Sequence, residues 1–160
     1  MKILKFAIWT LILTSCQAVN NNSCSNAIKF PNAEMMEKTV KPGFTGDLNN
    51  YWGTDTKKLD FKHSFLDGKI IQSKFYYENG KVQEEYNYKC QSLHGSMKYF
   101  YENGQLLAIV SYEFGRREGN SFKYDSLGNV RQKVIFRNDK LIGEPISYDE
   151  NGNELKESTN

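Results

Sequence analysis

The feature that most constrains the fold is an internal repeat of 24 residues. Glycines recur at this spacing in two sets, at positions 80, 104, 128 and 152 and at positions 95, 119 and 143. The phrase FYYENG at 75–80 returns as YFYENG at 99–104, and a weaker copy opens at Tyr51. Self-similarity at a fixed spacing predicts stacked copies of one supersecondary unit.

Within each unit, apolar and polar residues alternate. Tyr99 and Tyr101 precede the second Glu-Asn-Gly phrase, and Leu106, Ala108, Val110 and Tyr112 follow it. A period of two predicts strands with one apolar face, and Asn-Gly favours a two-residue type I′ turn between them. We therefore predict an all-β fold, a single-layer twisted antiparallel β-meander of 24-residue hairpins over residues 59–156.

Stacking the copies predicts ladders of apolar side chains on one face. The first ladder would hold Phe75, Tyr99, Phe122 and Ile146, the second Tyr77, Tyr101, Tyr124 and Tyr148, and the third Phe65, Tyr88, Tyr112 and Phe136. Burying one aromatic side chain removes about 150–250 Å² from water, an upper estimate of ~4–6 kcal/mol. Sheet curvature, residues 30–58 or a partner must therefore cover this face. We expect the first two to share the task and to leave part of a trough open.

The residues that flank the repeats divide into four parts. Residues 1–15 contain two lysines and an apolar run that is shorter than the ~20 residues of a bilayer span and typical of a secretory signal peptide. Residues 16–30 are rich in Asn and Ser and predict a flexible tether. Residues 31–58 predict an irregular segment with a short helix at Ala33–Val40, and residues 157–160 a disordered tail.

The sequence Leu13-Thr14-Ser15-Cys16 resembles the bacterial lipobox. The resemblance implies a lipid on the Cys16 sulfur, cleavage before Cys16, and a chain that is exported and anchored to a bacterial membrane. Gln17 is not the Asp that retains some lipoproteins at the inner membrane, which favours the outer membrane or cell surface in a two-membrane cell. The alternatives are an ordinary signal peptide followed by a coincidental cysteine and, less favoured, a retained uncleaved anchor.

Charge and cysteine content narrow the possible ligands. Removing Lys2 and Lys5 from the 21 basic residues leaves 19, which equals the 19 acidic residues. This balance gives no electrostatic reason to expect a nucleic-acid partner. Cys24 and Cys90 either form a disulfide in the oxidising conditions met by an exported protein or remain free thiols. Neither has the neighbours of a metal site, and we predict no metal and no cofactor.

The unit resembles the MORN repeat in its bacterial variant. The stretch from Tyr112 to Gly119 matches the Tyr-x-x-Gly-x-x-x-Gly core, and Phe65 to Gly68 keeps its first half. Gln91 and Asp139 stand where glycine is usual, so we expect differently shaped connections there. The resemblance covers residues 59–152 and implies a twisted sheet used as an interaction surface. Some bacterial proteins that look similar are antitoxins or immunity proteins, which would neutralise a toxin by binding it.

The sequence favours binding over catalysis. We interpret His63, on the apolar face, as structural and His94 as a solvated turn residue, and no catalytic set converges. The prediction is a non-enzymatic lipoprotein that binds a protein partner, for which a toxin is one option. An envelope scaffold or host-facing adhesin is the alternative, followed by a glycan-binding protein or an enzyme. The oligomeric state is not indicated. Because tyrosine combines area with a polar tip, the proposed trough residues are Tyr77, Tyr99, Tyr101, Tyr112, Phe122, Tyr124 and Tyr148.

Overall fold

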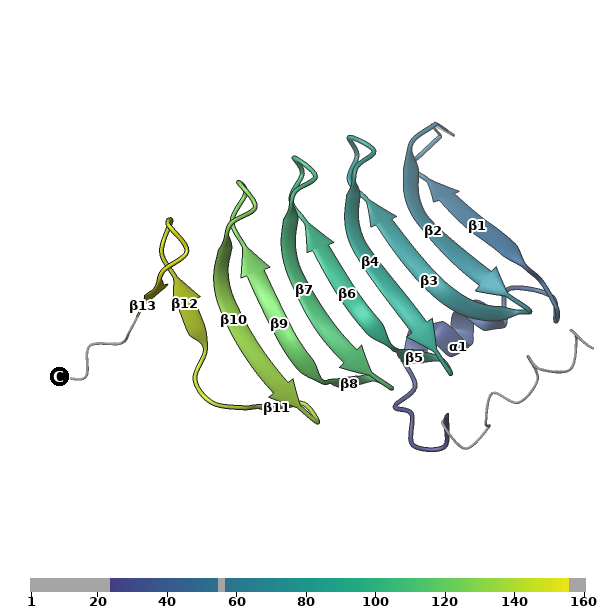
Figure 1. Cartoon of the computed structure of the whole chain (residues 1–160). Helices are drawn as coiled ribbons and strands as arrows, with labels where there is room; N and C mark the ends of the chain where they lie inside the picture. Colours follow the sequence, from purple (N-terminus) through teal and green to yellow (C-terminus); the bar gives the residue numbers. More distant parts are fainter. Residues whose placement is uncertain (1–23, 55–56, 156–160) are drawn as a thin grey trace, which may run out of the picture.

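The computed structural model describes residues 24–54 and 57–155, so the predicted signal peptide and Cys16 lie outside the described residues. The strands form one sheet in which neighbours along the chain are neighbours in space, in the order β1-β2-β3-β4-β6-β7-β9-β10-β12-β13. Every pairing is antiparallel. The predicted open meander is therefore confirmed (Figure 1).

The described residues contain one helix and short to medium strands. The elements are α1 (Pro31–Glu37), β1 (Gly46–Tyr51), β2 (Leu59–Leu66), β3 (Lys69–Tyr76), β4 (Val82–Lys89), β5 (Ser92–Leu93), β6 (Gly95–Phe100), β7 (Leu106–Glu113), β8 (Arg116–Arg117), β9 (Gly119–Tyr124), β10 (Val130–Arg137), β11 (Lys140–Leu141), β12 (Ile146–Tyr148) and β13 (Glu154–Leu155). No helix among the described residues is long and apolar enough to cross a membrane.

The Glu-Asn-Gly phrases form three-residue loops along one edge of the sheet. Tyr77 N donates to Lys81 O at 2.8 Å, and Gly80 N donates to Tyr77 O at 2.9 Å. Gly80, with φ +82°, is the one residue of this loop in the left-handed region. The predicted type I′ turn is therefore wrong, because that turn needs two such residues. Asn79 instead stabilises the wider loop by accepting a 2.9 Å hydrogen bond from Lys81 N through its Oδ1.

Type I′ turns occur at the opposite edge. Both central residues have positive φ in the pairs Asp67-Gly68, Cys90-Gln91, Phe114-Gly115 and Asn138-Asp139. The expectation of different connections at Gln91 and Asp139 is therefore wrong. Contacts with other segments explain how a non-glycine residue holds this conformation. Gln91 O accepts from Phe30 N at 2.7 Å, and Asp139 Oδ1 accepts from Arg117 N at 2.9 Å.

The second set of glycines interrupts strands close to these turns. Gly95 and Gly119 have φ of +83° and +91°. Just before each glycine, His94 N donates to Asn87 O and Glu118 N donates to Ser111 O, both at 2.9 Å. These irregularities separate β5 from β6 and β8 from β9. Such interruptions bend strands, and the strands of Figure 1 are curved.

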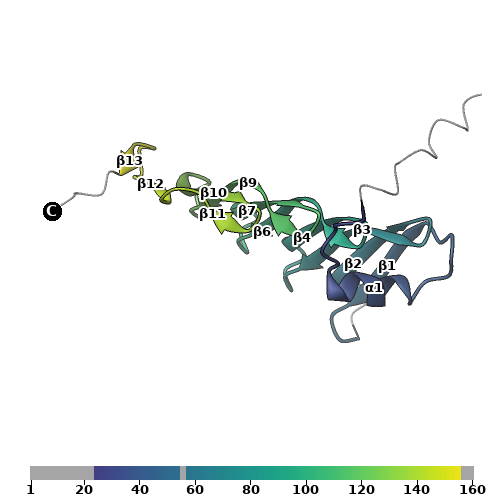
Figure 2. The ribbon, with the colours of Figure 1, turned by 90° about the horizontal axis from the view of Figure 1, so that it is seen from below.

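Residues 24–45 are here called the N-terminal cover. Their helix α1 packs on one face of the first half of the sheet (Figure 2). Ala33 of α1 is fully buried in a cluster with Phe65, Ile70, Tyr88 and Leu93. The expectation that residues 30–58 help to cover the apolar face is therefore confirmed. That segment is less irregular than predicted, because residues 46–51 add strand β1 to the sheet edge.

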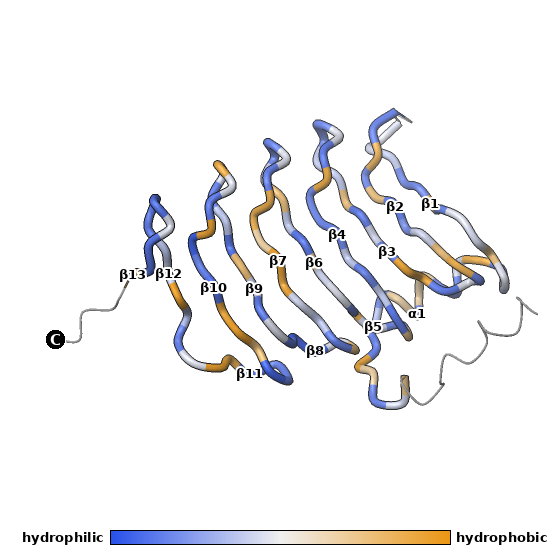
Figure 3. Tube along the Cα trace, in the orientation of Figure 1, coloured by the Kyte–Doolittle hydropathy of each residue, from blue (hydrophilic) through white to orange (hydrophobic). Residues whose placement is uncertain are grey.

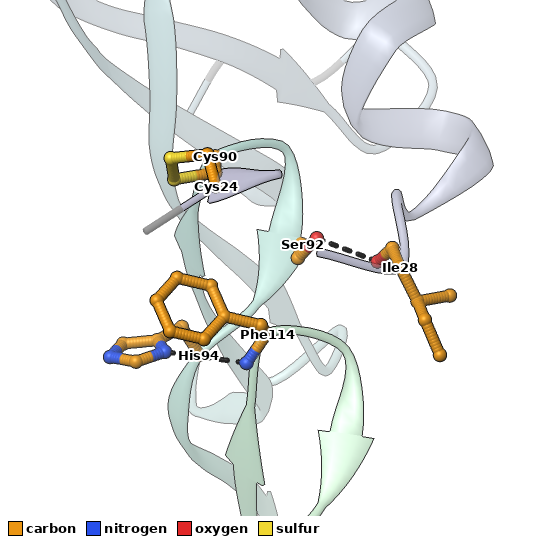
Figure 4. The surroundings of a disulfide bond; sticks show 6 residues. All are labelled: Cys24, Ile28, Cys90, Ser92, His94 and Phe114. Carbon is orange, nitrogen blue, oxygen red and sulfur yellow. Dashed lines mark hydrogen bonds between the residues drawn. A yellow bond between two sulfur atoms is a disulfide. The ribbon is translucent and has the colours of Figure 1, made fainter. Parts of the chain in front are cut away.

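The first residues of the cover do not behave as the predicted tether. Cys24 and Cys90 form a disulfide, and Ser92 Oγ donates to Ile28 O at 2.6 Å, as Figure 4 shows. Ile28 N also donates to Phe114 O at 2.9 Å. Residues 24–30 are thus fixed along the edge that carries the type I′ turns.

The register corrects the predicted ladders. Ala108 pairs with both Tyr99 and Lys123, whereas Phe122 pairs with Ile109 and Lys133. Paired residues share a face of the sheet, so Tyr99 lies on the face beneath α1, the helix face, and Phe122 lies on the opposite, outer face. The single ladder through Phe75, Tyr99, Phe122 and Ile146 is therefore wrong.

Candidate functional site

The helix face is covered along its first half and open along its second. Beyond the N-terminal cover, a groove of about 510 Å³ follows β6, β7, β9 and β10. We call this groove the open trough, and its side chains on the helix face include Tyr99, Ala108, Val110, Tyr112, Arg117, Ser121, Lys123, Gln132, Val134 and Phe136. Figure 3 shows apolar stretches along β7 and β10, the two longest strands of this half. The arrangement offers an elongated, largely apolar surface.

A cation lies at the turn end of the open trough. The guanidinium of Arg117 sits 4.2 Å from the centre of the Phe136 ring, and its Nε is 3.3 Å from Asp139 Oδ1. Hydrogen bonds from the Arg117 backbone and side chain lower the pKa of Asp139. Arg117 occupies the place that Leu93 holds one repeat earlier. The ladder of Phe65, Tyr88, Tyr112 and Phe136 therefore continues into the open half, where the charged Arg117 replaces the apolar Leu93 beside it.

Two further polar groups lie in the open trough without partners. Ser121 is 4% exposed, and its hydroxyl makes no hydrogen bond within the described part of the chain. Lys123 is exposed and forms no ion pair with any residue that the structure describes. No aspartate or glutamate lines the groove. The trough is therefore apolar with a positive charge bias.

The structure brings together only part of the predicted trough. Tyr99 and Tyr112 line it. Tyr77 and Tyr101 lie at the loop edge, where their hydroxyls donate to Phe100 O at 2.7 Å and Tyr124 O at 2.9 Å. These two tyrosines tie each loop to the next repeat.

The other three predicted residues belong to the outer face. Phe122 borders the groove through β9, but its register places the side chain opposite Ile109, and its ring centroid is 6.4 Å from that of Tyr124. Tyr148 alternates with Ser147, which pairs with Gln132 of the helix face. Arg117, Ser121 and Lys123 were not predicted, although aligning Asp125 with Tyr101 would have placed Lys123 beside Tyr99.

Both histidines contact other residues of the fold through their rings. His63 Nδ1 lies 2.9 Å from Ser73 Oγ, and both residues are buried beneath the cover. His94 is not solvated as predicted, because it packs 4.8 Å from the Phe114 ring and its Nδ1 accepts a 3.4 Å hydrogen bond from Phe114 N (Figure 4). Burial lowers the pKa of both imidazoles. Within residues 24–54 and 57–155, no cluster of His, Cys, Asp or Glu could hold a metal ion.

The fold and the trough define an open β-repeat protein whose apolar helix face is uncovered along its second half. Residues 71–89 and 93–113 match the MORN repeat variant, and these segments are the hairpin β3–β4 and the unit from β5 to β7. The match supports the resemblance of these two segments to the MORN repeat. No curated protein matches the chain.

Proposed function

We propose that this chain is a non-enzymatic binding protein whose open trough takes a protein partner. The observation that carries the proposal is the asymmetry of the helix face. Phe65 and Tyr88 are 2% and 7% exposed under the cover, whereas Tyr112 and Phe136 continue the ladder and are only half-buried. Burial of apolar area releases about 25 cal/mol per Å², so this surface favours association.

The proposal places the protein at a bacterial membrane. The lipobox-like segment supports lipid attachment at Cys16, and Cys24 is fixed to the sheet by its disulfide. The eight steps between these cysteines, at ~3.3–3.6 Å each, would hold the domain within roughly 30 Å of the lipid. The resemblance to antitoxin and immunity proteins favours a toxin as the partner, and a toxin gene beside this one would support that choice.

The test is retention of a partner from envelope extract by the immobilised mature chain, with crosslinking to map the contact. We expect a retained protein to crosslink to the open trough and to be lost with the double variant Tyr112→Ala, Phe136→Ala. Ile135→Ala removes an exposed apolar side chain from the outer face and should leave retention unchanged. Retention of no protein, or equal loss with the outer-face variant, would contradict the proposal.

A further inference from the structure

The contacts of α1 show how the helix face binds a short segment of polypeptide. Ala33 packs into the aromatic cluster, and four residues later the Glu37 carboxylate accepts hydrogen bonds from Lys69 Nζ at 3.1 Å, Ile70 N at 3.2 Å and Gln91 Nε2 at 2.6 Å. The Glu37 side chain is only 7% exposed. The cover is thus held by an apolar contact and by a carboxylate that binds donors near the turns.

The open trough repeats the apolar part of the surface on which α1 packs. Tyr112 and Phe136 follow Tyr88 at intervals of 24 residues in the same ladder, and they occupy the same places beside the turns. Among the described residues, no equivalent of Ala33 or Glu37 lies over Tyr112 and Phe136. The aromatic surface that α1 uses is therefore present again without its cover.

The charge of the open trough favours a ligand that carries an anionic group. Lys123 is exposed on the helix face and forms no ion pair with a described residue. Ser121, two residues away on the same face, is buried beneath the surface of the trough. Because no carboxylate lines the groove, a carboxylate that pairs with Lys123 would have to come from a partner. Charge-assisted hydrogen bonds of this kind are about twice as strong as neutral ones.

We infer that the open trough takes an acidic, apolar segment of the partner protein, similar in chemistry to residues 28–37 of this chain. An apolar side chain of that segment packs between Tyr112, Val134 and Phe136. A neighbouring carboxylate meets the exposed Lys123 ammonium. The inference rests on the proposed function, because it specifies what the same trough binds.

Selection from a random dodecapeptide display library on the mature chain tests the inference. We expect selected peptides to combine apolar residues with Asp or Glu. Lys123→Glu should weaken the binding of those peptides at least tenfold and shift a fresh selection toward Lys and Arg. Lys123 is exposed and unpaired, so this change leaves the fold intact, which circular dichroism verifies.

Lys133→Glu is the matched control, because Lys133 lies on the neighbouring strand but pairs with Phe122 on the outer face. It should keep the acidic preference. Selected peptides that need Tyr112 and Phe136 but show no acidic preference would overturn the inference and leave the proposed function standing. Failure to select any peptide, or binding of phosphatidylglycerol vesicles alone that Lys123→Glu abolishes, would also overturn it, and the proposed function would then be judged by partner retention.

Discussion

At Gly115 the sheet and the N-terminal cover meet with no room for a side chain. A Cβ there would lie 2.4 Å from Ile28 O, and the residue has φ +89°. Gly95 has a similar φ of +83° but nothing within 4 Å of the equivalent Cβ. Both Gly→Ala changes incur the left-handed penalty of roughly 1–2 kcal/mol. We expect Gly115→Ala to lose about 1–3 kcal/mol more in urea unfolding, because of the clash. Equal losses would show that the cover does not rest there.

His63 makes stability depend on pH. Burial lowers the pKa of its imidazole below the ordinary value of 6.5, so the unfolded chain binds the proton more readily than the folded one. Stability is then complete above pH 6.5 and falls as the pH drops below that value toward the lowered pKa. We expect His63→Gln to flatten this dependence in urea unfolding between pH of about 7.5 and about 5. His94→Gln separates the contribution of the second histidine, whose pKa is also lowered. An unchanged slope in His63→Gln would contradict the assignment.

At the scale of the hairpin, the loop tyrosines link one repeat to the next. The Tyr101 hydroxyl donates to Tyr124 O at 2.9 Å across two adjacent loops. We expect Tyr101→Phe to lower the free energy of unfolding by about 0.5–1.5 kcal/mol, the net value of one such bond. Tyr124→Phe is the matched control, because its hydroxyl has no hydrogen bond to a described residue, and it should change stability little. Equal effects of the two variants would refute a role for this bond.

The hairpins were predicted correctly from the sequence, but the register of the third unit was predicted wrongly. Strand periodicity and glycine spacing placed the turns at the right positions, although the predicted type I′ turn at the Glu-Asn-Gly phrases was wrong. The error in the predicted register arose at Asp125. This residue takes the loop position of Tyr101, and its carboxylate accepts hydrogen bonds from Leu127 N at 3.0 Å and Asn129 N at 2.9 Å. A carboxylate there satisfies the loop without an aromatic ring, so matching tyrosines shifted the alignment by one residue. A shift of one exchanges the two faces, which explains why Phe122 lies outside.

At the scale of the whole molecule, the sequence indicated that the apolar face needs a cover but not which half receives it. The answer depends on contacts between distant residues, such as Glu37 with Gln91 and Ile28 with Phe114. The Asn- and Ser-rich composition before Phe30 predicted a flexible tether. This prediction is wrong for residues 24–30, because composition carries no information about contacts with residues far along the chain. The open trough follows directly from this placement, since the cover ends where the second half of the sheet begins.

The disulfide should decide whether the cover stays in place. Cys24 and Cys90 are 66 residues apart, and closing a loop of that length stabilises the folded state by about 4 kcal/mol in the chain-entropy account. We expect the double variant Cys24→Ser, Cys90→Ser to lose roughly 2–4 kcal/mol in urea unfolding. Amide exchange should quicken at Phe65 and Ile70, which the cover buries, but not along β9 and β10, which pair with each other beyond it. Uniform acceleration across the sheet would mean that the ribbon unfolds as one unit and that the cover has no separate stability.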